Sequence, residues 1–145
     1  VRIPSALIDE MVAHAREDLP NEACGMVHAR DGVPMAVHRV KNTTASPYRY
    51  EMDGLEVARL ERQRDESGEE LFAIYHSHVA SEARPSMTDI RQAFFPPGEI
   101  ETGLFMYPEA LYILVSLAED PPPSVRAWRI VREAPHVIEE PIEVV

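Results

Sequence analysis

His76 and His78 are separated by a single residue and stand at the end of an apolar run over residues 71–78 (LFAIYHSH). Alternate residues of a strand point to the same side, so both imidazoles can face one point. Imidazole nitrogens are common ligands of zinc. This pair is a weak signal on its own, because two ordinary histidines at a strand end have the same spacing.

Ser86 and Asp89 follow at a spacing that strengthens the metal interpretation. Asp89 would lie near the start of a short helix, where a loop can bring it back to the strand end that carries the histidines. Two neutral imidazoles and one carboxylate leave one position of a tetrahedral zinc ion for water, which is the arrangement of a catalytic site. Bound zinc lowers the pKa of water to about 7. As ordinary structural residues, Ser86 would cap a helix and Asp89 would favour its N-terminus.

These residues resemble the JAMM (MPN+) metalloprotease motif, in which H-x-H is followed, after seven residues, by S-x-x-D. Upstream, residues 20–25 (PNEACG) resemble the segment that carries the catalytic glutamate of that family. Asn42 with residues 46–48 (SPY) resembles the family's loop before its second helix. The resemblance covers nearly the whole chain and agrees with its order of elements.

The resemblance implies a role for each motif residue. His76, His78 and Asp89 would bind Zn²⁺. Glu22 would take a proton from the attacking water and pass it to the leaving amine. Ser86 would donate a hydrogen bond to the developing oxyanion. Without the resemblance, Glu22 would be interpreted as a solvated surface glutamate.

Val79 departs from most eukaryotic members, which have proline after the second histidine. The stretch over residues 76–89 (HSHVASEARPSMTD) is similar instead to the small bacterial branch of the family. That branch includes a hydrolase of sulfur-carrier proteins and deconjugases of ubiquitin-like modifiers. The resemblance therefore implies cleavage after the C-terminal Gly-Gly of such a protein, releasing either cysteine or a lysine-linked protein. The sequence does not choose between these two leaving groups.

Three other functions are alternatives to a zinc-dependent hydrolase. A non-catalytic MPN scaffold is the main alternative, although such scaffolds typically lack one or more of the motif residues. A zinc deaminase would need a Cys-x-x-Cys pair, and Cys24 is the one cysteine of the chain. A DNA-repair-associated JAMM protein is disfavoured by the lack of a basic cluster and by the Glu22 segment.

The elements that must position these residues follow from periodicity and turn signals. Helices are expected over residues 5–18, 53–66 and 88–95. Strands are expected over residues 23–30, 34–40, 71–78, 111–118 and 124–131, with a candidate strand over 48–52 and an edge strand in the tail, 136–145. Asp31-Gly32 is a strong hairpin-turn signal between the first two strands.

This order predicts one α/β domain over residues 1–145, with a mixed, mainly antiparallel sheet sandwiched by helices. The resemblance implies the cytidine-deaminase-like MPN fold. The net charge of −11 and the absence of Lys/Arg clusters disfavour nucleic acid as a partner. No apolar run approaches the roughly 18 residues of a membrane helix, and no signal-peptide pattern opens the chain, so a cytoplasmic location is expected. The sequence does not determine the oligomeric state, and a homodimer is one possibility.

Overall fold

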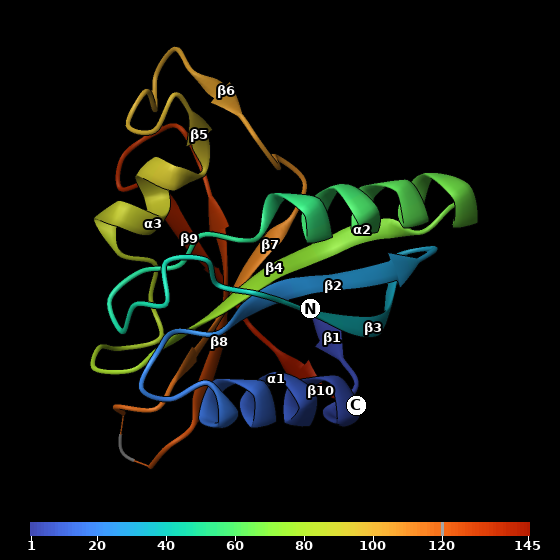
Figure 1. Ribbon diagram of the computed structural model, residues 1–145, viewed down its shortest axis with the longest axis vertical. Coiled ribbons are helices and arrows are strands. Elements are labelled where there is room, and N and C mark those ends of the chain that lie inside the picture. The colour runs from blue at the N-terminus through green and yellow to red at the C-terminus, as the bar shows by residue number, and fades with distance from the viewer. Residues whose placement is uncertain (120) are drawn as a thin grey trace.

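The computed structural model describes residues 1–119 and 121–145, and it shows a six-stranded sheet with helices on both faces (Figure 1). The strands are β2 (Cys24–Arg30), β3 (Val33–Val40), β4 (Glu70–His78), β7 (Leu111–Ser116), β8 (Ser124–Ile130) and β9 (Val137–Glu140). Their order is β3-β2-β4-β7-β8-β9, and neighbours are antiparallel except β4 and β7, which are parallel. The predicted mixed, mainly antiparallel sheet is confirmed.

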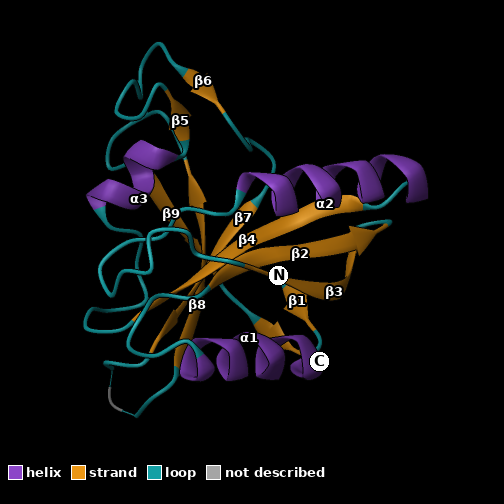
Figure 2. Cartoon of the chain, viewed as in Figure 1, coloured by secondary structure: helices purple, strands orange, loops and turns teal. Residues whose placement is uncertain are grey.

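Two short strand pairs lie beside this sheet. They are β1 (Arg2–Ile3) with β10 (Glu143–Val144), and β5 (Phe94–Phe95) with β6 (Leu104–Phe105). The first pair joins the two ends of the chain in parallel. The second pair projects beyond the main sheet next to α3 (Figure 2).

The helices are α1 (Ser5–Glu17), α2 (Gly54–Ser67) and α3 (Met87–Gln92). Figure 2 shows α1 on one face of the sheet and α2 and α3 on the other. Met11 of α1 packs in one buried cluster with Tyr75, whereas Leu60 of α2 and Ile90 of α3 belong to clusters on the opposite face. Among the helices of the described residues, none is both long and apolar enough to cross a membrane.

Local sequence signals explain where several elements begin and end. Asp31 and Gly32 have φ values of 51° and 77°, which suits a tight turn of the hairpin between β2 and β3. The Asp53 side chain accepts a hydrogen bond from the backbone N–H of Glu56 and caps α2. Gly68, with a φ of 75°, ends the same helix in the left-handed conformation that glycine adopts without strain.

Two expectations from the sequence were wrong. Residues 48–52 do not form a strand of the sheet, and only Met52 forms a bridge, to Asn42, within the part of the chain that the structure describes. The helix expected over 88–95 ends at Gln92, because Phe94 turns into β5 and its ring packs 4.6 Å from that of Phe105. In both segments, contacts with distant residues determine the backbone conformation.

The sheet topology brings the motif residues to one end of the molecule. Cys24, the first residue of β2, pairs with His76 near the end of β4 in antiparallel register. Glu22, which precedes β2, therefore lies at the edge where β4 ends. The chain leaves β4 at His78 and returns in α3, whose first turn contains Asp89.

Candidate metal centre

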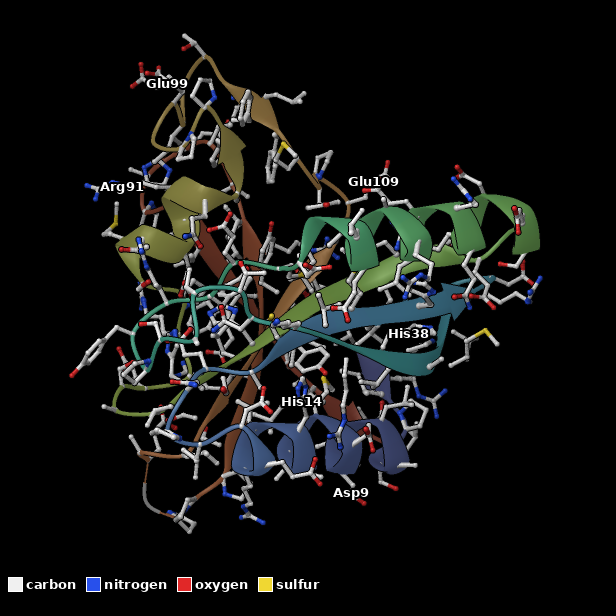
Figure 3. The ribbon with its side chains drawn as sticks, viewed as in Figure 1. Asp9, His14, His38, Arg91, Glu99 and Glu109 are labelled. Atoms are coloured by element: carbon white, nitrogen blue, oxygen red, sulfur yellow. The ribbon has the colours of Figure 1, made fainter. Side chains whose placement is uncertain are left out.

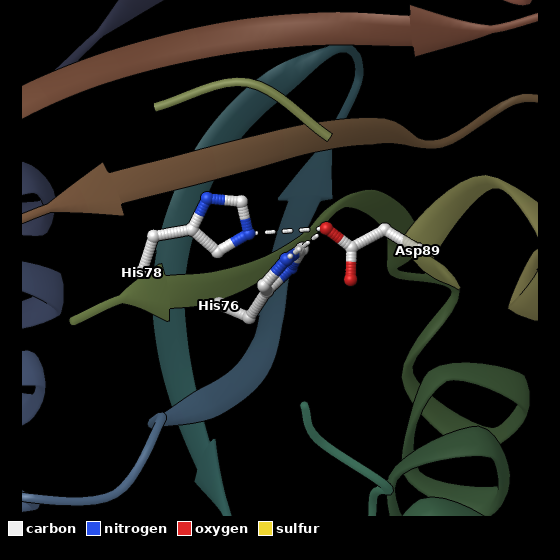
Figure 4. Close-up of side chains that lie close together, drawn as sticks. All are labelled: His76, His78 and Asp89. Carbon is white, nitrogen blue, oxygen red and sulfur yellow. Dashed lines mark hydrogen bonds and ion pairs between the residues drawn. The ribbon is translucent and has the colours of Figure 1, made fainter. Parts of the chain in front are cut away.

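His76 and His78 project from the same face of β4, and Asp89 of α3 faces them (Figure 4). The Nε2 atoms of the two imidazoles lie 3.0 Å and 3.1 Å from the same oxygen, Oδ2, of Asp89. All three side chains are buried. Within residues 1–119 and 121–145, this is the one group of His, Cys, Asp or Glu side chains whose ligand atoms are close enough to share a metal ion.

The hydrogen bonds of His78 make this cluster suited to a cation. Its Nδ1–H donates to the backbone carbonyl of Glu82 at 2.7 Å, so the neutral ring has a bare lone pair at Nε2. That lone pair faces a carboxylate oxygen of Asp89 at 3.1 Å, and the two repel unless a proton or a metal ion lies between them. The donor set and the carbonyl behind His78 suit a metal ion.

His76 supplies a second sign that a ligand belongs here. Both of its ring nitrogens are buried without a hydrogen-bond partner among the described residues. Its 3.0 Å approach to Asp89 is close, but it lacks hydrogen-bond geometry. Buried polar atoms normally have partners, and a metal ion bound by Nε2 would provide one.

The contacts within the cluster favour the charged forms of Asp89 and His78. Burial by itself would raise the pKa of Asp89, but His76, His78 and the N–H of Ser86 outweigh it and hold this pKa well below its usual range. Burial would lower the pKa of His78, but its bonds to Asp89 and to the carbonyl of Glu82 raise it. The carboxylate is therefore ionised and ready to balance a cation.

Glu22 lies beside this cluster with 3% of its surface exposed. Its Oε1 is buried without a hydrogen-bond partner among the residues that the structure describes. Burial raises the pKa of Glu22 to about 8, against an opposing effect of His78 and with a further increase from Asp89. A carboxyl group that titrates near neutral pH can accept and return a proton. Its role as the catalytic base stays a prediction.

Ser86 combines the two functions considered for it from the sequence. Its Oγ accepts a hydrogen bond from the N–H of Asp89 at 3.1 Å and caps α3. In return, Oδ2 of Asp89 accepts from the N–H of Ser86 at 2.8 Å. This capping box fixes the carboxylate that faces the imidazoles. Because Oγ serves as an acceptor in the cap, its own O–H remains able to donate to a substrate.

Two contributions to this site were missed from the sequence. The ring of Tyr50 stacks on the His76 imidazole at 4.3 Å between centroids, although a strand had been expected around it. Trp128 of β8 is buried and donates from Nε1 to the carbonyl of Ala83 at 2.8 Å. That bond anchors the loop whose Glu82 carbonyl accepts from His78. The resemblance had singled out Asn42 and residues 46–48 of the same loop, but not Tyr50.

His14, His38 and Cys24 lie outside the metal group. Figure 3 shows His14 on α1, directed toward the sheet, and His38 on β3. Nδ1 of His14 lies 2.7 Å from the hydroxyl of Tyr75, which ties α1 to β4. Burial raises the pKa of the Cys24 thiol to about 12, so this thiol is unsuited to nucleophilic chemistry.

Comparison with known proteins agrees with this geometry. A family model described as prokaryotic homologs of the JAB domain matches residues 4–131. A CysO-cysteine peptidase of Mycobacterium tuberculosis is 37% identical over 145 residues, which cover 99% of this chain and 90% of that protein. A desampylase of Haloferax volcanii is 34% identical over 95 residues, covering 61% of this chain and 68% of that protein.

Among solved structures, a JAB1/MPN domain protein from Archaeoglobus fulgidus superposes with a TM-score of 0.58. The alignment covers 100% of this chain and 99% of that one at 18% identity. Likeness at this level of identity concerns the fold, and it confirms the MPN architecture expected from the sequence.

Proposed function

We propose that this chain, which belongs to the family of prokaryotic homologs of the JAB domain, is a zinc-dependent peptidase or isopeptidase. The observation that supports this most is the approach of two buried imidazoles to one carboxylate oxygen beside Glu22. The names of the relatives, a CysO-cysteine peptidase and a desampylase, support hydrolysis as the reaction class.

In this proposal His76, His78 and Asp89 hold zinc, which supplies a Lewis acid for the carbonyl and an activated water. The Glu22 carboxylate accepts a proton from the attacking water and delivers it to the leaving amine. Its burial keeps the proton from escaping to solvent between the two transfers. The hydroxyl of Ser86 donates to the oxyanion that develops on the scissile carbonyl.

The proposed substrate is a ubiquitin-like or sulfur-carrier protein with a C-terminal Gly-Gly. A groove of about 400 Å³ between α2 and α3 is lined by Tyr50, Ile74 and Tyr112, and the ring of Tyr50 stacks on His76. Glycines have no side chains, so an extended Gly-Gly tail can enter a narrow approach to the metal. Backbone pairing with an extended segment would hold such a tail without demanding particular side chains.

The test offers the zinc-loaded protein three substrates: a carrier–cysteine adduct, a carrier–lysine conjugate and an unrelated unfolded protein. We expect turnover of at least one of the first two and little of the third. Comparable turnover of the unfolded protein would contradict the proposed specificity. Cleavage of only one carrier substrate would decide between a biosynthetic hydrolase and a deconjugase.

The alternative of a non-catalytic MPN scaffold has a distinct outcome in the same test. A scaffold would bind the carrier protein but cleave neither linkage, even with one zinc ion per chain. The location of the cleaved bond by mass spectrometry would complete the assignment, since the proposal requires it to follow the second glycine.

A further inference from the structure

We propose that Asn42 is a positioning residue that holds the base Glu22 in place and connects it to the loop covering His76. The inference rests on the proposed function, because that function makes Glu22 the base. Asn42 belongs neither to the metal group nor to the lining of the groove described above, although it bonds to the backbone of Glu51, which lines that groove. Its effect would pass through hydrogen bonds to the backbone of other residues.

The backbone at Glu22 lies where the regular sheet has ended. Ladder pairing of β2 begins at Cys24, so Glu22 lies outside it. The N–H of Glu22 donates to the carbonyl of Ser46 at 2.8 Å, and its carbonyl accepts from Nδ2 of Asn42 at 3.0 Å. On the other side, the N–H of Ala23 donates to Oγ of Ser77 at 2.8 Å. Loop contacts therefore replace the ladder at this residue.

One amide group organises that loop. Asn42 is 8% exposed, and its Nδ2 donates to the carbonyl of Arg49 at 3.2 Å as well as to Glu22. Its Oδ1 accepts from the N–H and the hydroxyl of Thr44, at 3.2 Å and 2.7 Å, and from the N–H of Glu51 at 3.0 Å. Aspartate would lose the two donors, and an apolar side chain would lose every bond.

The same amide reaches the metal centre from a second direction. Arg49 and Glu51, both bound to Asn42, flank Tyr50, whose ring stacks 4.3 Å from that of His76. The position of the base and the cover of a metal ligand thus depend on one side chain. His76 itself comes from β4, so loss of Asn42 should displace the base more than the metal.

Asn42→Asp retains an acceptor for Thr44 and Glu51 but loses the bonds that Nδ2 donates to the carbonyls of Glu22 and Arg49. We expect kcat to fall by about 10²-fold, the loss typical of an ångström-scale misplacement of a reacting group. KM and the zinc affinity, measured by competition with a chromophoric chelator, should stay within about threefold of the wild type. Thr44→Val is the matched control, since it removes one bond to Asn42 and none to Glu22.

A double-mutant cycle distinguishes positioning from general destabilisation. In a Glu22→Gln background, where the base is already lost, Asn42→Asp should cause no further fall in kcat. An equal fold-loss in both backgrounds would overturn the proposal. The same would follow if Thr44→Val reduced kcat as much as Asn42→Asp does.

A measurement without zinc or substrate tests the positioning directly. In the metal-free protein, amide hydrogen exchange at Glu22 and Ala23 should become about tenfold faster in Asn42→Asp, while exchange within β4 stays the same. Unchanged protection at Glu22 would contradict the inference. If Asn42→Asp does not fold, Asn42→Ser replaces it in both experiments. The serine side chain is shorter than that of asparagine but still offers an acceptor for Thr44 and Glu51.

The two sets of results also separate this inference from the proposed function. A wild-type protein that cleaves no carrier conjugate would refute the function, whereas the exchange rates would still show whether Asn42 orders Glu22. If the wild-type protein cleaves a carrier conjugate and Asn42→Asp has the same kcat and the same exchange rate at Glu22, the inference alone is refuted.

Discussion

Two clusters of this protein contain two imidazoles and one carboxylate, but one is buried throughout and the other only at one of its histidines. One is the metal group of His76, His78 and Asp89 at the end of β4. The other, called here the arginine-closed cluster, comprises His28, His38, Glu69 and Arg64 beneath the C-terminal half of α2.

In the arginine-closed cluster both nitrogens of His28 are occupied. Nδ1 donates to Glu69 at 3.3 Å, and Nε2 accepts from Arg64 at 3.1 Å. The Glu69 carboxylate has its own positive partner, since Nη2 of Arg30 lies 3.7 Å from its Oε1. In the metal group, no arginine or lysine from the described residues forms an ion pair with Asp89, whose Oδ2 faces two imidazole nitrogens. One cluster thus has arginines among its partners, whereas the metal group has no such partner among the described residues and could hold a metal ion instead.

The largest difference between the clusters should appear on loss of a carboxylate. The wild-type protein should bind about one zinc per chain, and Asp89→Ala should weaken zinc binding by more than the ~10–100-fold typical of outer-shell partners, because it removes a ligand. Glu69→Ala is the matched control and should leave zinc affinity unchanged. Zinc content and chelator competition measure both. A folded, active wild-type protein without metal would contradict the zinc assignment.

Removal of the base should have the next largest effect and should leave the metal group intact. Glu22→Gln preserves size and removes the proton acceptor, so activity should fall by about 10²–10⁴-fold while zinc remains bound. Metal analysis and steady-state kinetics on the same sample check this. Loss of zinc from the variant would show instead that Glu22 is a ligand.

Ser86 should contribute less, because its helix-capping role and its proposed catalytic role are separable. Ser86→Ala should reduce kcat by about 10²-fold through the missing oxyanion donor. It should also lower the free energy of unfolding by about 1 kcal/mol through the lost cap. Ser86→Thr keeps a hydroxyl for both purposes and should recover most of each loss. Unchanged kcat in Ser86→Ala would leave the residue as a helix cap only.

The smallest predicted effect concerns the acid stability of the arginine-closed cluster. Burial lowers the pKa of His28 to about 4 from an ordinary value of 6.5, with His38 and Arg64 adding to the decrease and Glu69 opposing it. The unfolded chain therefore binds a proton at a higher pH than the folded one does. The free energy of unfolding should fall as the pH decreases from about 6.5 to about 4.

His28→Gln tests this because it keeps a donor and an acceptor but does not titrate in that range. Urea unfolding of the metal-free variant should show a weaker decline across the same pH interval than the wild type. An identical decline in both proteins would assign the acid sensitivity to other groups, such as His14 and His38, whose pKa values burial also lowers.

Much of the fold could be predicted from local pattern, and the failures share one cause. The helix before Pro20, the Asp31-Gly32 hairpin and the strand before His78 have local signals in residue spacing, turn residues and caps. Residues 48–52 and the segment at Phe94 had no comparable signal, because their conformations depend on Asn42 and on β6, which lie elsewhere in the chain.

For the site, the sequence by itself determined which side chains are candidate ligands and how they are placed along β4 and α3. Alternation along β4 places His76 and His78 on one face, and the Ser86 cap presents Asp89 in the first turn of α3. Both relations act over a few residues, so spacing alone carries them. Only the tertiary structure decided which of the two histidine pairs lacks an arginine partner. It also decided that Glu22 lies beside the metal group, that Asn42 bonds to the backbone of Glu22, and that Tyr50 stacks on His76. Those relations depend on the pairing of β2 with β4 and on loop contacts between distant parts of the chain, which local periodicity does not encode.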